Sequence, residues 1–166
     1  MPTLLCTGKY RKTFGLPEKL TPTTIDEGAL GPWYANTLNV GPQRLLHFMS
    51  APSLLSVVIT LRERSTAEQR FVRAVSELLR SLGVERRYIE LEATLFAKVT
   101  YARSSDRSKL GSLRDQGDLA WHYVADGRSL HDVNDRLSIT PCGPMGYDSP
   151  ATVAPARLKA RWWQRD

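Results

Sequence analysis

Cysteine is scarce in this chain, which has only Cys6 and Cys142 among its 166 residues. The two cysteines lie near opposite ends and stand in no Cys-x-x-Cys or Cys/His spacing, so the sequence indicates neither a disulfide scaffold nor a zinc site. No apolar run approaches the roughly 20 residues that span a bilayer, and no secretory leader pattern follows Met1. We therefore expect a reduced, cytoplasmic protein with no membrane span and no bound metal.

The charge balance is basic, with 23 Lys and Arg residues against 17 Asp and Glu residues, a formal net charge of +6 and a sequence pI near 9.6. A positive charge favours approach to phosphate-rich or acidic partners. The cationic side chains are nevertheless interspersed with acidic ones, which is also typical of an ordinary solvated surface. The composition thus makes nucleic acid a candidate partner without identifying it.

Short apolar runs predict strands in the first half of the chain. Residues 3–7 form one such run, and residues 33–40, 44–49 and 54–61 form three more that are separated by Gly41-Pro42 and Ala51-Pro52-Ser53. Runs of this length, with β-branched and aromatic residues between turn signals, are typical of an antiparallel meander. The alternation in residues 93–101 predicts a further strand.

Helical spacing dominates the second half. Residues 66–82 carry an apolar stripe that includes Phe71 and Leu78, with Ser65 or Thr66 as N-cap in a capping box and Gly83 as the stop. A second helix is expected from Asp106 or Ser108 to Val124, and a third from Ser129. Strands first and helices later predict one α+β domain over residues 1–150, an antiparallel β-meander sheet packed with about three to four helices. Residues 151–166 then form a basic, Trp-containing C-terminal tail or helix.

The segment from Arg107 to Asp115 combines polar groups with a glycine beside an apolar helical face. Spacing places Ser108, Ser112, Asp115 and His122 opposite a stripe formed by Leu110, Leu113, Gly117, Ala120, Trp121 and Val124. A hydroxyl, a carboxylate and an imidazole are the side-chain groups that many hydrolases use as nucleophile, orienting group and base. Side chains on one straight helix, however, splay apart instead of converging on a reacting atom. Helix capping with a solvated face is the simpler interpretation.

Three further sets of residues have a functional and a structural interpretation. Arg157, Lys159, Arg161 and Arg165 surround Trp162-Trp163, which is suited to phosphate neutralisation and base stacking, although a tryptophan folded back as an apolar anchor is preferred. His47 stands alone between apolar neighbours, which indicates a core or edge histidine and not a metal ligand. The carboxylate pairs Asp26-Glu27 and Glu90-x-Glu92 are interpreted as surface.

Several motifs, taken in order, resemble those of an uncharacterised bacterial family, domain-of-unknown-function family 6933. The resemblance covers residues 4–150 and implies no reaction and no cofactor. The motifs are Leu5-Cys6-Thr7, Leu30-Gly31-Pro32-Trp33-Tyr34-Ala35-Asn36, Phe96-Ala97-Lys98, Arg107-Ser108-Lys109-Leu110-Gly111-Ser112 with Asp115, and Asn134 followed by Thr140-Pro141 and Gly146-Tyr147-Asp148-Ser149-Pro150.

Our leading hypothesis is an intracellular binding module, an accessory or antitoxin-like protein that engages nucleic acid or a protein partner. Its expected binding residues are Asn36, Arg107, Ser108, Ser112 and Asp115, with Arg157, Lys159, Arg161 and Arg165 as the nucleic-acid-binding set. The alternative is a small enzyme whose polar pocket is built from Asn36, Arg107, Ser112 and Asp115. A small-molecule ligand is also compatible with the sequence. A pocket that joins those four residues would favour the enzyme, and a continuous basic stripe would favour the nucleic-acid binder.

Overall fold

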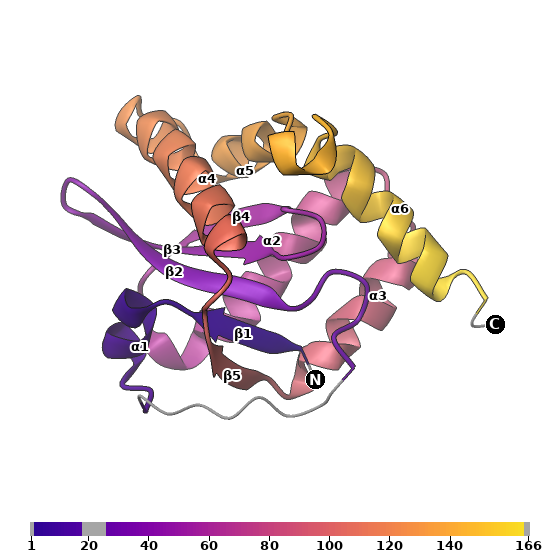
Figure 1. Cartoon of the computed structure of the whole chain (residues 1–166), viewed down its shortest axis with the longest axis horizontal. Helices are drawn as coiled ribbons and strands as arrows, with labels where there is room; N and C mark the ends of the chain where they lie inside the picture. The colour runs from indigo at the N-terminus through magenta and orange to yellow at the C-terminus, as the bar shows by residue number, and fades with distance from the viewer. Residues whose placement is uncertain (1, 18–25, 165–166) are drawn as a thin grey trace.

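A five-stranded mixed sheet organises the computed structural model, which describes residues 2–17 and 26–164. The strand order is β4-β3-β2-β1-β5, with helices on both faces (Figure 1). The strands are β1 (Thr3–Cys6), β2 (Trp33–Val40), β3 (Gln43–Ser50), β4 (Ser56–Thr60) and β5 (Thr100–Arg103). In the described residues no helix has the length and apolar character needed to cross a membrane.

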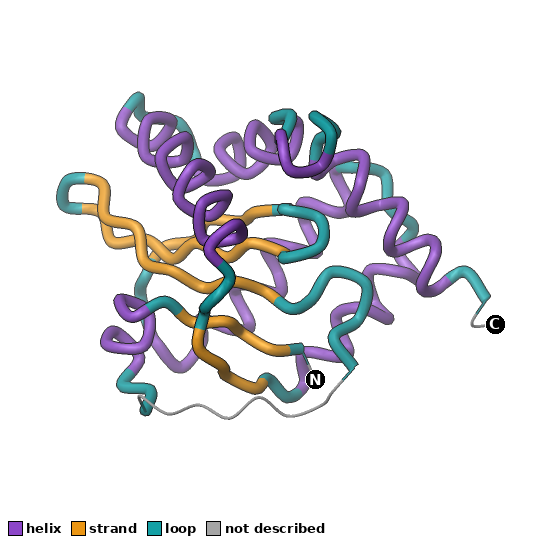
Figure 2. The backbone as a smooth tube through the Cα atoms, viewed as in Figure 1, coloured by secondary structure: helices purple, strands orange, loops and turns teal. Residues whose placement is uncertain are grey.

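The three antiparallel strands of the predicted meander are present as part of the sheet, with somewhat different ends. β2 pairs antiparallel with β3, and β3 pairs antiparallel with β4, while the β2–β3 hairpin projects beyond the other strands (Figure 2). The sheet as a whole is not antiparallel, however, because β1 runs parallel to both β2 and β5. β1 is therefore an inner strand that lies between β2 and β5. Parallel strands must be joined by long crossover connections, and short-range sequence patterns do not show which strands such connections bring together.

Within the described residues six α-helices accompany the sheet, more than the three to four that were predicted. They are α1 (Gly8–Phe14), α2 (Ala67–Ser81), α3 (Arg86–Thr94), α4 (Arg107–Ala125), α5 (Leu130–Ile139) and α6 (Pro150–Trp162), with short 3₁₀ turns at Arg64–Thr66, Leu95–Ala97 and Gly143–Met145. The strand predicted for residues 93–101 is wrong for most of its length. That segment instead completes α3, passes through a 3₁₀ turn and enters β5 only at Thr100.

Local capping fixes where the later helices begin. The Asp106 side chain accepts a hydrogen bond from Lys109 N at 3.1 Å at the start of α4, and Ser129 Oγ accepts one from Asp132 N at 3.2 Å at the start of α5. The capping box predicted for α2 is wrong, because Thr66 makes no capping bond to the helix. Its hydroxyl instead accepts a hydrogen bond from Arg70 Nε at 3.1 Å.

The main core lies between the sheet and α2. Phe71 is fully buried, and its ring stacks on Phe48 at a centroid distance of 4.2 Å and meets the edge of Trp33 at 5.0 Å. Leu78 is also buried, as the helical stripe predicted. A second cluster lies on the opposite face, where α4 and α5 cover β3 and β4 through Leu45, Val58, Ala120 and Val133.

A buried carboxylate joins three distant segments, and it corrects the interpretation of Glu92 as a surface residue. The side chain of Glu92 is 3% exposed, and it accepts hydrogen bonds from Ala29 N, Leu30 N and Trp162 Nε1 at 2.7–3.0 Å. Burial raises the pKa of Glu92, and the backbone donors of Ala29 and Leu30 oppose that rise. Trp162 is buried as the apolar anchor expected for the tail.

Candidate functional site

A polar groove lies where the parallel strands end. It occupies about 240 Å³ between the first turn of α1, the outer part of β2 and the facing side of α4. The groove residues include Thr7, Lys9, Asn36, Leu110, Arg114 and Asp118. In sheets with parallel strands, ligands commonly bind beyond the carboxyl ends of those strands, so this position is a natural candidate site.

Thr7 and Asn36 form the fixed polar part of the groove. Thr7 follows β1 directly, and its N–H donates to Ala35 O at 3.1 Å. The Thr7 hydroxyl accepts a hydrogen bond from Tyr10 N at the start of α1 and donates one to Asn36 Oδ1 at 2.7 Å. These contacts hold the Asn36 amide in one orientation, and its Nδ2 donors have no hydrogen-bond partner within residues 2–17 and 26–164.

Two cationic residues line the same groove as this amide. Lys9 reaches the groove from α1 and Arg114 reaches it from α4, and both residues are exposed. Asp118 follows Arg114 by one helical turn, and Trp121, which is 41% exposed, follows by two turns on the same side of α4. Trp121 was predicted to lie in the buried stripe, and that prediction is wrong. Gln116, which was not placed in that stripe, is buried on this helix.

His47 forms the floor of the groove but offers no reactive group to it. The imidazole is 1% exposed, and its Nε2 lies 2.9 Å from Ser56 Oγ, which in turn donates to Gln116 Oε1. Burial lowers the pKa of His47 to about 4, so the ring is neutral at neutral pH. Ser56 is itself completely buried, and the pair is therefore a structural brace and not a serine nucleophile with its base.

The Arg107–Asp115 segment does not join Asn36 in one pocket. Ser112 and Asp115 line a separate hollow of about 120 Å³, which Gln116 and Cys142 also line. Arg107 and Ser108 are exposed at the first turn of α4, and they line neither this hollow nor the groove beside Asn36. The four residues of the hypothetical enzyme pocket are thus divided between different places on the surface.

The basic tail is partly engaged in holding α6 in place. Arg157 Nε donates to Ala29 O at 2.9 Å, and Arg161 forms an ion pair with Asp26 at 2.7 Å. Lys159 is exposed, and Arg165 lies outside the described residues. Two of the four cations predicted to bind nucleic acid therefore have structural partners, and Asp26 is correspondingly tied to α6.

Thr7, Lys9 and Arg114 belong to the candidate site although sequence reasoning did not select them. Thr7 and Lys9 follow the first strand, where a parallel neighbour for β1 would have indicated a ligand position, but that pairing is set by tertiary contacts. No group of three or more His, Cys, Asp or Glu side chains suited to a metal ion occurs in the part of the chain that the structure describes.

Comparison with known proteins identifies a family. Neither a curated protein nor a solved structure gives a significant match to the chain. One family model matches residues 3–153, a span that contains Thr7, Asn36 and Arg114 of the groove. The chain therefore belongs to the family described as Domain of unknown function (DUF6933), as its ordered motifs indicated.

Proposed function

We propose that this protein is a binding module for single-stranded nucleic acid, with the groove between α1 and α4 as its contact surface. The observation that carries the proposal is that Lys9 of α1 and Arg114 of α4 line the same groove as the Asn36 amide. Two cations in one groove can neutralise phosphate, and the amide donors of Asn36 suit a phosphate or base oxygen.

The surroundings of the groove extend the same chemistry. A second hollow of about 370 Å³ lies beside α1 and is lined by Arg11 and Lys12. Along α4, the exposed indole of Trp121 offers an aromatic face on which a base can stack. A cationic groove next to an aromatic platform is typical of proteins that bind single strands with little sequence preference.

The test is fluorescence anisotropy with labelled oligo(dT) and a labelled mixed-sequence RNA, measured over a series of salt concentrations. Each phosphate contact that is removed should reduce the steepness of the dependence of log K on log salt by about 0.7. The double variant Lys9→Gln/Arg114→Gln should therefore bind more weakly and with a shallower slope. Trp121→Ala should cost about 1 to 3 kcal/mol of binding free energy, and Trp121→Phe should restore most of it.

Lys159→Gln is the matched control, because it removes one charge from an exposed position on α6. Binding through the groove predicts that this variant keeps the wild-type salt slope. Equal weakening by Lys159→Gln would indicate attraction to overall charge alone, or to the tail. Failure to bind any single-stranded probe at low salt would remove the proposal and leave a protein partner as the remaining binding hypothesis.

A further inference from the structure

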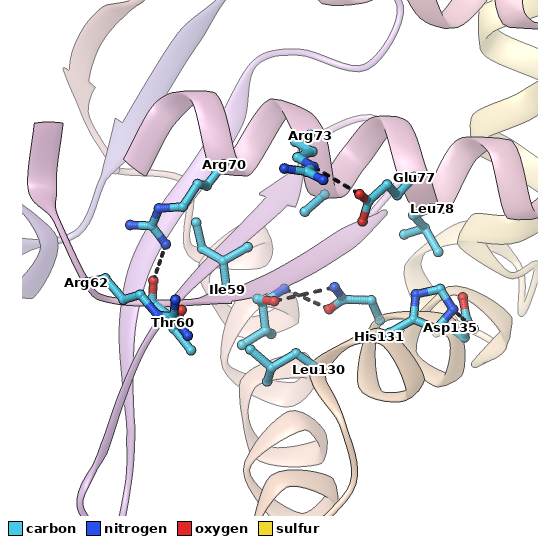
Figure 3. A pocket seen from close by; sticks show the side chains of 13 residues that line it. Ile59, Thr60, Arg62, Arg70, Arg73, Glu77, Leu78, Leu130, His131 and Asp135 are labelled. Carbon is cyan, nitrogen blue, oxygen red and sulfur yellow. Dashed lines mark hydrogen bonds and ion pairs between the residues drawn. The ribbon is translucent and has the colours of Figure 1, made fainter. Parts of the chain in front are cut away.

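A second groove lies along β4, the strand at one edge of the sheet. It occupies about 380 Å³ between α2 and α5, with β4 forming its back wall. Figure 3 shows the helical residues of the groove above and below the strand. Its apolar residues are Val58, Ile59, Ala74, Leu78 and Leu130. The volume is in the range of small-molecule sites.

Side chains close the backbone edge of β4 within this groove. Asn134 Oδ1 accepts a hydrogen bond from Val58 N at 2.8 Å, and Asn134 Nδ2 donates to Val58 O at 3.4 Å. Arg70 Nη1 donates to Thr60 O at 2.5 Å. An added peptide strand would need these same backbone groups, so the groove is suited to recognition by side chains and not to strand addition.

One end of the groove holds guanidinium groups without carboxylate partners. Arg70 donates to three neutral oxygens, those of Thr66, Thr60 and Glu63, and the Glu63 acceptor is the backbone carbonyl. A guanidinium has five N–H donors, so two of the Arg70 donors remain available. Arg62 follows Thr60 by two residues and makes no hydrogen bond or ion pair with any other described residue.

At the opposite end of the groove the basic side chains have carboxylate partners. Asp135 lies 3.3 Å from His131, and Glu77 forms an ion pair with Arg73 at 3.1 Å (Figure 3). The carboxylates therefore gather toward the Glu77 and Asp135 side, while Arg62 and Arg70 hold unneutralised positive charge next to Thr60. An anionic group entering the groove is directed to the Arg62 and Arg70 end.

We propose that this groove binds a small organic oxyanion, whose phosphate or carboxylate head contacts Arg62 and Arg70 and whose apolar body lies against Ile59, Ala74 and Leu130. The guanidinium of Arg70 is held by its three bonds before the ligand arrives, so little side-chain entropy is lost on binding. This site is separate from the proposed nucleic-acid groove and does not depend on it.

The experiment is a two-dimensional NMR titration of the whole ¹⁵N-labelled protein with hexyl phosphate, hexanoate, inorganic phosphate and hexanol. Hexyl phosphate or hexanoate should give saturable shifts of the backbone amides of residues 58–62 and 130–135, with a dissociation constant of roughly 1 mM for a ligand of this size. The stronger of these two probes identifies the head group. Inorganic phosphate and hexanol, which carry only the head or only the body, should each bind more weakly.

Arg62→Gln should weaken binding of the stronger probe about tenfold, because one charge-assisted contact is lost. Arg80→Gln removes the same charge from an exposed position on α2 outside the groove, and it should leave the affinity unchanged. Equal weakening by both variants, or shifts that hexanol alone reproduces, would overturn the proposal, as would the absence of saturable shifts with all four probes. The Lys9→Gln/Arg114→Gln variant should bind the probe normally, which keeps this test distinct from that of the nucleic-acid groove.

Discussion

Glu92→Gln should destabilise the protein strongly although it only replaces one carboxylate oxygen with an NH₂ group. Three N–H donors converge on the carboxylate of Glu92: those of Ala29, Leu30 and Trp162. Glutamine offers one oxygen in place of two, so its NH₂ group must face at least one of these donors. With the oxygen toward Ala29 and Leu30, the indole N–H of Trp162 loses this acceptor.

The magnitude follows from the contacts. A buried donor that loses its acceptor costs about 1 to 3 kcal/mol, and the remaining two bonds lose the strength that the negative charge gave them. Relief from burying a charge offsets part of this loss. We therefore expect about 2 to 3 kcal/mol of lost stability, which corresponds to a fall in Tm of roughly 4 to 12 °C for a chain of this size.

Urea denaturation and thermal melts of the wild type and of Glu90→Gln provide the comparison. Glu90 lies on the same helix in an exposed ion pair with Arg86, so its substitution should cost less than about 0.5 kcal/mol. Trp162→Phe should lower the free energy of unfolding less in the Glu92→Gln background than in the wild type, because both substitutions affect the same hydrogen bond between Trp162 Nε1 and the Glu92 carboxylate. Equal midpoints for Glu92→Gln and Glu90→Gln would refute the reasoning.

Three other substitutions test the core, the floor of the groove and the strand edge. Phe71→Ala should cost about 3 to 5 kcal/mol through lost burial and a cavity, measured by urea denaturation, and an unchanged midpoint with an unchanged slope would contradict its place in the core. Because burial lowers the pKa of His47 from 6.5 to about 4, the unfolded state binds the proton more readily, and stability should fall by about 3 kcal/mol as the pH drops through that window. Denaturation midpoints of His47→Asn over the same pH range should show a smaller fall, and an identical pH profile would show that other groups cause it. Asn134→Ala should lower the free energy of unfolding by about 1 to 3 kcal/mol, because the backbone N–H and C=O of Val58 lose their partners. These open backbone groups at an edge strand should also cause concentration-dependent association in sedimentation velocity. The control variant Asp135→Ala should associate no more than the wild type.

Elements set by local signals could be predicted from the sequence. The meander was predicted because its apolar runs are separated by Gly41-Pro42 and Ala51-Pro52-Ser53, and α4 and α5 because Asp106 and Ser129 are strong N-cap residues. α2 was predicted from its apolar stripe even though the expected capping box is absent. These features depend on residues only a few positions apart.

Features that depend on distant partners were missed. β5 has four residues, and the alternation just before it is carried by the end of α3 and a 3₁₀ turn, so period alone placed a strand too early. Glu92 looks like any surface carboxylate in sequence, because its donors lie 62 to 70 residues away. In the candidate groove, Asn36 was selected from its motif, but Lys9 and Arg114 come to the same groove only through the pairing of β1 with β2 and the packing of α4 on β2.

The inner position of β1 has a consequence for the order in which the protein folds. The β2–β3–β4 meander joins neighbouring segments and can form early, whereas Thr3 of β1 lies beside Thr100 of β5 at a separation of 97 residues. During synthesis the first strand must therefore wait for β5 to leave the ribosome before both of its edges are paired. Amide hydrogens of the meander should gain protection first in pulsed hydrogen exchange, and those of the β1–β5 ladder should gain it last.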